Sequence, residues 1–102
     1  MINEIVHLIV KDDLGKQFEI DFEMAKSIVA KIKGFISLKL YKKLEEEGSY
    51  LLIIAWETVN NHKVGFRSSL EYQEWKNLLY KYYDHVPEVE YFEEIIQQVP
   101  IW

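Results

Sequence analysis

The chain has 102 residues, a formal net charge of −5 at pH 7 and no cysteine. This length predicts one domain spanning residues 1–102, because two domains would each be too small to bury a core. The acidic balance argues against nucleic acid or an anionic membrane as a partner, and the lack of cysteine excludes disulfides, thiolate metal sites and a cysteine nucleophile.

The first predicted element is a strand over residues 1–10. Apolar residues occupy both of its faces, so we expect a central strand that is covered on both sides. A polar segment follows, in which Asp12 or Asp13 is expected to cap a helix. Apolar residues then recur at steps of three and four, which predicts an amphipathic helix that Gly34 ends. The buried stripe of this helix would consist of Phe18, Phe22, Ala25, Val29 and Ile32.

Two strands joined by a hairpin are predicted next. Residues 35–41 alternate again, and the charged, glycine-closed segment 45–49 is typical of a hairpin loop. The apolar run over residues 50–56 should therefore pair antiparallel with the preceding strand and lie buried within the sheet.

A second helical region and a final strand complete the pattern. A short helix is predicted over residues 59–66, and Ser68 with Glu71 has the capping-box spacing that restarts a helix. A last strand is predicted over residues 89–96. We expect the terminal Trp102 to pack against other residues, because an exposed tryptophan is unusual at a free end.

The order of these elements predicts an α+β fold, a ferredoxin-like βαββαβ sandwich with an antiparallel four-stranded sheet. Both helices then lie on one face of the sheet. The other face is apolar and bare, which favours a homodimer in which two sheets face each other. The apolar runs are too short to span a bilayer and residues 1–4 lack the basic start of a signal peptide, so the sequence predicts a cytoplasmic protein.

Five short segments spread over nearly the whole chain resemble the antibiotic biosynthesis monooxygenase family of dimeric α+β barrels. They are Gly34-Phe35-Ile36-Ser37, Ile54-Ala55-Trp56-Glu57, Asn61-His62, Tyr72-Gln73-Glu74-Trp75 and Pro87-Glu88-Val89-Glu90-Tyr91. The resemblance implies the dimeric barrel. Some members of the family are cofactor-free oxygenases that convert phenols or quinols into quinones and bind the substrate between the sheet and the helices, whereas other members degrade haem.

The chain departs from this family at the positions that carry chemistry. The haem-degrading members need an Asn on the first strand and a Trp and a His on the second helix. The matching positions hold, in that order, His7, Gly65 or Phe66, and Trp75. The resemblance therefore implies neither haem degradation nor any cofactor. Quinol oxygenases often carry two histidines on this helix, and the chain has Phe66 and Glu71 there instead.

His7 is the candidate catalytic residue. It lies in the middle of an apolar strand, and an imidazole that faces the helix-side cavity could take a phenolic proton near neutral pH. The alternative is a core or interface histidine satisfied by a neighbouring carbonyl. His62, near a helix start, and His85, in a loop, are expected at the surface. The three histidines lack ligand spacing, so no metal site is predicted.

Aromatic side chains supply the candidate binding site. They could form a wall that stacks on a planar ligand, although a small core also uses rings for bulk alone. The wall would consist of Trp56, Phe66, Tyr72 and Trp75. Arg67 could pair with a phenolate or a carboxylate of the substrate, and its alternative role is that of a surface charge.

The sequence supports two functions from different classes. The first is a cofactor-independent monooxygenase that acts on a small aromatic phenol or quinol, with His7 as the base. The second is a non-catalytic homodimer that binds a small ligand or has a structural role, because Phe66 and Glu71 replace the histidines of relatives. Sequence alone leaves it open whether the chain is an enzyme.

Overall fold

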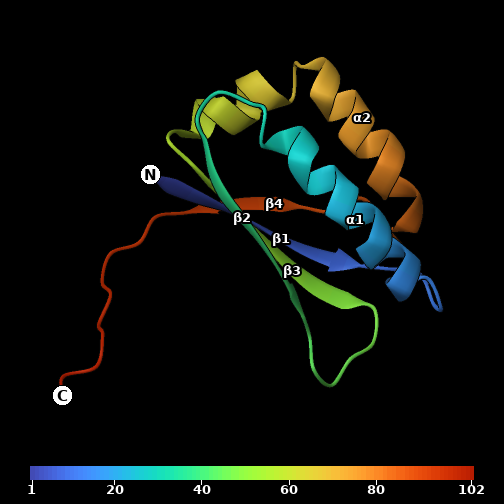
Figure 1. Cartoon of the computed structure of the whole chain (residues 1–102), viewed down its shortest axis with the longest axis horizontal. Helices are drawn as coiled ribbons and strands as arrows, with labels where there is room; N and C mark the ends of the chain where they lie inside the picture. Colours follow the sequence, from blue (N-terminus) through green and yellow to red (C-terminus); the bar gives the residue numbers. More distant parts are fainter.

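A computed structural model describes all 102 residues, and it contains one four-stranded antiparallel sheet with helices on one side (Figure 1). The elements are β1 (Ile2–Ile9), α1 (Gly15–Val29), β2 (Phe35–Lys42), β3 (Ser49–Trp56), η1 (Asn61–Phe66), α2 (Leu70–Leu79), η2 (Tyr80–Tyr82) and β4 (Val89–Phe92). The strand order is β2-β3-β1-β4, which confirms the predicted α+β, ferredoxin-like fold. None of the helices combines the length and the hydrophobicity that a bilayer-spanning segment needs.

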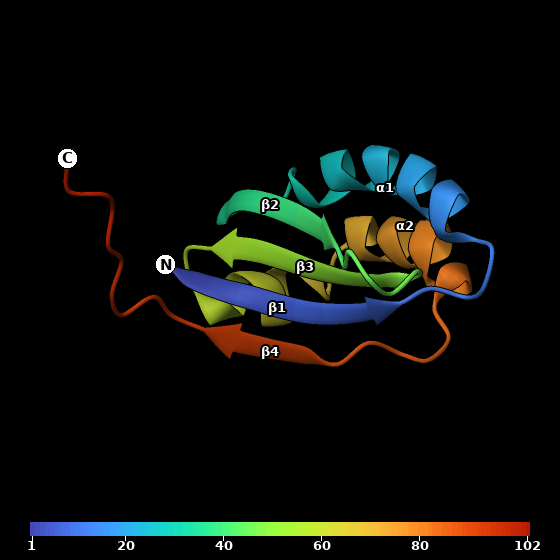
Figure 2. The same cartoon turned by 90° about the horizontal axis from the view of Figure 1, so that it is seen from below.

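The core lies between the sheet and the two helices, which cover the same sheet face (Figure 2). Side chains alternate along each strand, so every second residue of β1 and β3 points at the helices. The antiparallel register places Val6 opposite Leu52 and Leu8 opposite Tyr50, and all four are buried. Four residues of the predicted stripe of α1 pack on this layer, namely Phe18, Phe22, Ala25 and Val29, whereas Ile32 lies beyond the end of the helix and is only partly buried. The ring of Phe22 meets Trp75 of α2 edge to face, with ring centroids 5.5 Å apart.

The opposite sheet face has no cover within one chain. His7 is exposed there, and Ile5, Leu51 and Ile53 are only partly buried. The prediction that β1 is covered on both sides is therefore wrong for the single chain. The reason is topological, because both crossover helices of a βαββαβ unit pack on one side of the sheet.

Two helix boundaries differ from the predictions. Helix α1 has Leu14 as its N-cap and no side-chain cap, since Asp13 adopts a left-handed turn conformation with a φ of 65°. The cap of α2 is Ser69, one residue after the predicted Ser68, and the hydroxyl of Ser69 accepts a hydrogen bond of 3.1 Å from the Tyr72 amide. The hydroxyl of Ser68 instead donates to the Val64 carbonyl.

Gly34 belongs to the turn into β2, because α1 already ends at Val29. Its φ is 90°, a conformation that favours glycine, and a Cβ atom here would collide with the side chain of Asn61. The Asn61 Oδ1 atom accepts hydrogen bonds from the backbone amide and the hydroxyl of Thr58, at 2.9 and 2.8 Å. The absence of a side chain at position 34 thus leaves room for the residue that starts η1.

The short helix predicted over residues 59–66 is a π-helix, η1. Its wider turn is visible in the backbone, where the Arg67 amide donates to the His62 carbonyl at 3.2 Å, five residues back. This winding keeps His62, Phe66 and Arg67 on one side of the turn. Single-turn π segments are rare and occur frequently at functional sites.

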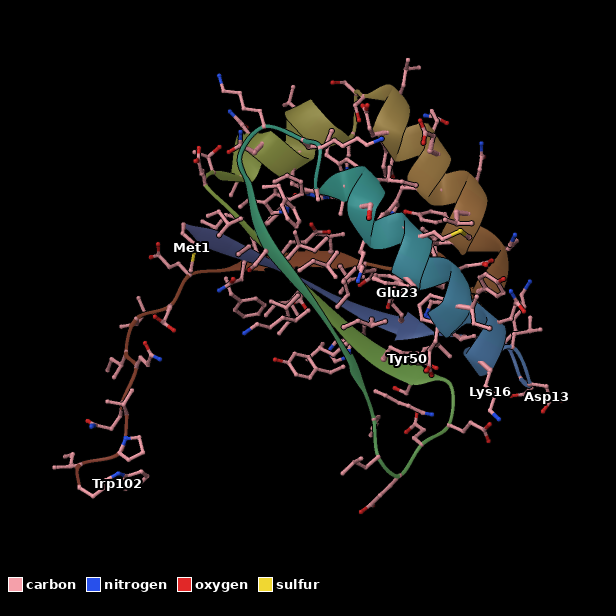
Figure 3. The ribbon with its side chains drawn as sticks, viewed as in Figure 1. Met1, Asp13, Lys16, Glu23, Tyr50 and Trp102 are labelled. Atoms are coloured by element: carbon pink, nitrogen blue, oxygen red, sulfur yellow. The ribbon has the colours of Figure 1, made fainter.

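The chain end extends away from the domain. Strand β4 stops at Phe92, four residues before the predicted Ile96, and the following residues form a tail (Figures 1 and 3). Trp102 is fully exposed at its end. The prediction that Trp102 packs on other residues is wrong for the single chain, since no part of the domain lies near the tail.

Candidate functional site

A cavity of about 390 Å³ lies between the sheet and the helical segments η1 and α2. It is lined by 16 residues, of which 11 are hydrophobic. Val6, Leu52 and Ile54 form part of the sheet wall, and Phe66 and Trp75 form part of the helical wall. A mostly apolar cavity of this size with a few polar groups is typical of a site for a small organic ligand.

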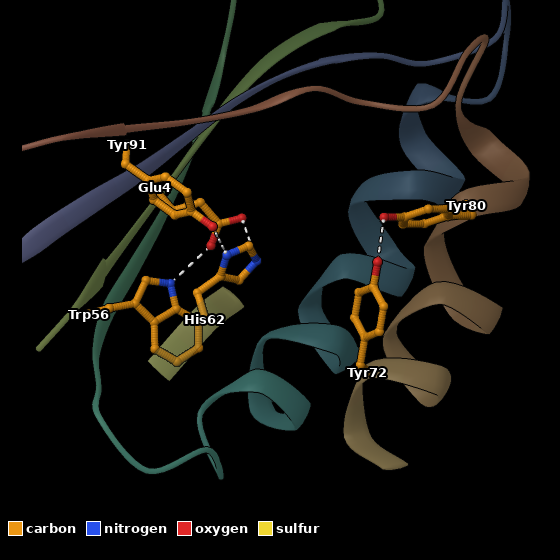
Figure 4. Close-up of polar contacts among 6 residues, drawn as sticks. All are labelled: Glu4, Trp56, His62, Tyr72, Tyr80 and Tyr91. Atoms are coloured by element: carbon orange, nitrogen blue, oxygen red, sulfur yellow. Dashed lines mark hydrogen bonds and ion pairs between the residues drawn. The ribbon is translucent and has the colours of Figure 1, made fainter. Parts of the chain in front are cut away.

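Glu4 is the only carboxylate in the lining, and it is 4% exposed. Both of its oxygens are engaged (Figure 4). The indole Nε1 of Trp56 donates to Oε1 at 2.9 Å, and Nε2 of His62 lies 3.3 Å from Oε2. A carboxylate is very costly to bury without such partners, so Trp56 and His62 account for its stability at this place.

His62 connects Glu4 to the edge of the sheet. Its side chain is buried, and Nδ1 lies 2.7 Å from the hydroxyl of Tyr91, a residue paired with Glu4 across β1 and β4. If the Tyr91 hydroxyl donates to Nδ1, the neutral imidazole carries its proton on Nε2 and donates it to Glu4. In this arrangement Trp56 and His62 donate to the carboxylate, and Tyr91 donates to His62.

Burial sets the protonation of this cluster. It raises the pKa of Glu4 to about 7, although the hydrogen bond from Trp56 and the charge of Arg67 act in the opposite direction. Burial also lowers the pKa of His62 to about 4, and Arg67 adds to this effect. At neutral pH the imidazole is therefore uncharged while Glu4 is divided between its acid and its carboxylate. The contact between them is a hydrogen bond rather than a fixed ion pair.

The helical wall contributes further polar groups. The hydroxyls of Tyr72 and Tyr80 lie 3.4 Å apart, and burial raises the pKa of Tyr80 (Figure 4). Arg67 and Lys76 also line the cavity. The ring of Phe66 packs edge to face on Tyr72, with centroids 5.2 Å apart. The cavity can therefore hold a planar aromatic group between rings and present it to a buried carboxyl.

The structure brings most of the predicted binding residues together. Phe66, Arg67, Tyr72 and Trp75 all line the one cavity. Trp56 does not line it but lies behind Glu4, to which it donates its indole hydrogen bond. Their role in binding a substrate remains a prediction.

His7 does not face this cavity. Its side chain is exposed on the open face of the sheet, opposite Leu51 of β3. The expected orientation towards the helix side is wrong, because the period of two along a strand places residue 7 on the face opposite to residues 4, 6 and 8. The surface position expected for His62 is also wrong, since its imidazole is buried at 3% exposure, whereas His85 is exposed as predicted.

Two residues of the cluster, Glu4 and Tyr91, were not predicted from the sequence. Glu4 had a visible signal, since it is the one charged residue among the alternate positions of β1 that otherwise hold Ile2, Val6 and Leu8. Tyr91 had none, because its partnership with His62 depends on the pairing of β4 with β1. No group of three or more His, Cys, Asp or Glu side chains comes together that could hold a metal ion.

The chain matches the model of the antibiotic biosynthesis monooxygenase family over residues 1–78. YczJ, an uncharacterised protein of Bacillus subtilis strain 168, is 43% identical over 95 residues, which cover 93% of this chain and 100% of YczJ. A solved structure from Bordetella bronchiseptica, provisionally named as an antibiotic biosynthesis monooxygenase, is 29% identical with a TM-score of 0.90 and covers 93% of this chain and 97% of its own.

SnoaB from Streptomyces nogalater, a cofactor-independent oxygenase, has the same fold at lower identity. It is 17% identical with a TM-score of 0.79, over 98% of this chain and 97% of SnoaB.

Proposed function

This chain belongs to the antibiotic biosynthesis monooxygenase family, and on that premise we propose that it oxidises a small aromatic phenol or quinol with molecular oxygen and without a cofactor. The observation that carries the proposal is the buried cluster of Glu4, His62 and Tyr91 at the wall of an aromatic-lined cavity. The activity named for SnoaB, which shares the fold, is of the same kind.

The proposed reaction balances without a cofactor. A phenol that has a hydrogen at its para carbon gives its hydroxyl proton to a base, and the resulting phenolate supplies electrons to oxygen. A carbon–oxygen bond forms at the para carbon, and cleavage of the oxygen–oxygen bond then releases water. One phenol and one O₂ give one para-quinone and one water, so the ring supplies all four electrons that reduce oxygen. A quinol, whose para carbon already bears oxygen, takes the new oxygen at a ring carbon that carries hydrogen, and one quinol and one O₂ give one hydroxyquinone and one water.

Glu4 is the proposed base in place of His7. A general base works best when its pKa lies near the working pH, and burial raises the pKa of Glu4 to about 7. The neutral imidazole of His62 contacts Glu4 through one nitrogen and Tyr91 through the other. For a proton to leave the carboxyl by this chain of contacts, the protonated Glu4 must donate to Nε2 while Nδ1–H donates to the Tyr91 hydroxyl, which is the reverse of the arrangement around the ionised carboxylate. Tyr91, which is only partly buried, can then pass a proton to solvent.

The aromatic wall has a positioning role in this proposal. Phe66 and Trp75 would hold the ring of the substrate and exclude water, which strengthens the interaction of a phenolate with the charges around it. The alternative function is ligand binding without turnover. It is favoured by Phe66 and Glu71, which stand where related quinol oxygenases often carry histidines.

We propose that the chain acts as a homodimer in which the open sheet faces meet and complete a dimeric α+β barrel. The open face carries Ile5, Leu51 and Ile53, and burying these side chains would be favourable. Light scattering at micromolar concentration is expected to give twice the mass of one chain, and a monomer would contradict the proposal. The cytoplasmic location stays a prediction.

The test of function is oxygen uptake with a panel of phenols and hydroquinones. We expect at least one compound to raise uptake above the rate in buffer and to yield the quinone. The Glu4→Gln variant should lose this activity, and Glu23→Gln is the matched control, since Glu23 is exposed on α1. A ligand that raises the melting temperature but is recovered intact from every incubation would favour binding without turnover.

A further inference from the structure

The charges that line the cavity differ from those of the whole chain. The chain has 17 acidic residues against 12 lysines and arginines. The lining instead contains two basic residues, Arg67 and Lys76, and one acidic residue, Glu4. Glu4 is already held by Trp56 and His62 at the sheet wall. The helical wall of the cavity is therefore cationic in an otherwise acidic protein.

Neither of these cations has a carboxylate partner. The ion pairs of the structure involve other basic residues, namely Lys26, Lys42, Lys43, His62 and Lys81. The Nζ atom of Lys76 instead lies 4.9 Å from the ring centroid of Tyr72, so its ammonium group rests on the aromatic lining. Two unpaired cations over one mostly apolar cavity are a suitable receptor for an anion.

The guanidinium of Arg67 acts on the interior of the site. Arg67 follows η1 directly, and its amide donates to the His62 carbonyl, so the π-turn holds the two residues together. Its positive charge opposes the rise that burial causes in the pKa of Glu4, Tyr80 and Tyr91, and it adds to the fall that burial causes in the pKa of His62. Arg67 is an exposed residue that also lines the cavity, so its guanidinium is accessible to a ligand that enters from solvent.

We propose that the ligand is an aromatic acid, in which a carboxylate bound by Arg67 and Lys76 orients the phenol hydroxyl towards Glu4. The inference rests on the proposed function, because it concerns the substrate of the same cavity. An arginine fork matches a carboxylate in two parallel hydrogen bonds, and the adjacent hydroxyls of Tyr72 and Tyr80 supply a further donor. A single-ring or two-ring acid suits a cavity of about 390 Å³.

The test compares acids with their neutral esters under nitrogen, where no turnover occurs. The probes are 3-hydroxybenzoate and 5-hydroxy-2-naphthoate, which both keep a hydrogen on the carbon para to the hydroxyl. Each is compared with its methyl ester, and the measurement is isothermal titration calorimetry at pH 7. We expect at least one acid to bind about tenfold more tightly than its ester, since charge-assisted hydrogen bonds exceed neutral ones by that order. Added sodium chloride should weaken the binding of the acid and leave that of the ester unchanged.

The double variant Arg67→Gln/Lys76→Gln should remove this preference. Its matched control is Lys33→Gln/Lys63→Gln, which loses the same charge from exposed positions outside the cavity and should keep the preference. Equal affinity for acid and ester, no binding of either acid, or a preference that survives in Arg67→Gln/Lys76→Gln would each overturn the inference.

The outcomes also separate this inference from the proposed function. An acid that binds through Arg67 and Lys76 but consumes no oxygen in air would refute the oxygenase and uphold the ligand class. If a neutral quinol is oxidised while both acids bind no better than their esters, the oxygenase is upheld and the ligand class is refuted.

Discussion

Strand β1 carries Glu4 on the helix-covered face of the sheet and His7 on the open face. Both side chains can titrate, and they belong to the same eight-residue strand. Glu4 is 4% exposed and accepts hydrogen bonds inside a cavity, whereas His7 is exposed on the open face of the sheet. The face of the sheet on which a titratable side chain lies is therefore more informative about a catalytic role than the residue type most often used as a base.

The largest expected effect separates these two residues by activity. Glu4→Gln keeps the size of the side chain but removes the base, so the rate of oxygen uptake should fall by about 10²- to 10⁴-fold. His7→Gln should change it by less than about twofold, because the side chain lies outside the cavity. Steady-state oxygen-electrode measurements check both. A large loss in His7→Gln with full activity in Glu4→Gln would reverse the comparison.

A second effect separates the two faces by stability. Leu52 is 3% exposed on the covered face and its neighbour Leu51 is partly exposed on the open face. Leu52→Ala should lower the free energy of unfolding by about 2 to 5 kcal/mol through lost burial and a cavity. Urea denaturation at low protein concentration measures it. Leu51→Ala serves as the matched control and should cost less, so equal losses would show that both faces are covered under those conditions.

A third effect concerns the pH dependence of stability. The pKa of Glu4 is raised from 4.5 to about 7 on folding, so the folded state holds its proton more tightly than the unfolded state. The contribution of Glu4 to the free energy of unfolding is present in full below pH 4.5. It is lost as the pH rises through 7, and the total loss is about 3 kcal/mol. The Glu4→Gln variant has no carboxyl at this position to ionise. Its free energy of unfolding should therefore rise relative to that of the wild type by about 3 kcal/mol between pH 4.5 and pH 8.

This third comparison is measured by urea denaturation of both proteins across the pH range. His62 contributes in the other direction, because its lowered pKa gives stability above pH 6.5 that is lost as the pH falls through about 4. Above about pH 5 the folded state holds His62 neutral with or without the Glu4 carboxyl, so the contribution of His62 cancels in the difference at those pH values. Parallel curves for wild type and Glu4→Gln would show that the carboxyl is not buried in solution.

The smallest expected effect concerns the outer end of the cluster. Tyr91→Phe removes the hydroxyl that lies 2.7 Å from His62 and should lower the free energy of unfolding by about 1 kcal/mol. Thermal or urea denaturation detects this change. The hydroxyl of Tyr41 on β2 has no hydrogen-bond partner, so Tyr41→Phe should stay within about 0.5 kcal/mol of wild type. Identical shifts in the two variants would argue against the contact between Tyr91 and His62.

Much of the fold could be predicted from local patterns. Alternation along the strands and steps of three and four along α1 specify which side chains are buried, and the glycine-closed turn specifies the hairpin between β2 and β3. The element boundaries were less predictable. Ser68 and Ser69 both suit an N-cap, and only the backbone decides that the Ser69 hydroxyl meets the Tyr72 amide.

The residues of the site also fall into those that could be predicted from the sequence and those that could not. Phe66, Arg67 and Trp75 could be proposed because they lie on or next to two helical segments, η1 and α2, that face the sheet. The contact between His62 and Tyr91 could not, since it requires both the strand order and the π-winding of η1. Local sequence rules assume α-helical spacing, and under that spacing His62 belongs to an exposed helix start.

The crowding of Gly34 against Asn61 has a consequence for attempts to change the ligand that this protein accepts. A side chain added at position 34 would displace Asn61, and Asn61 is the first residue of the turn that carries the imidazole of His62. The contact between Gly34 and Asn61, which lies outside the cavity, thus determines the position of the His62 imidazole at the cavity wall. Libraries that vary Tyr72 and Val86 reshape the cavity wall directly, whereas variation at Gly34 would misalign the proton path while leaving every lining residue unchanged.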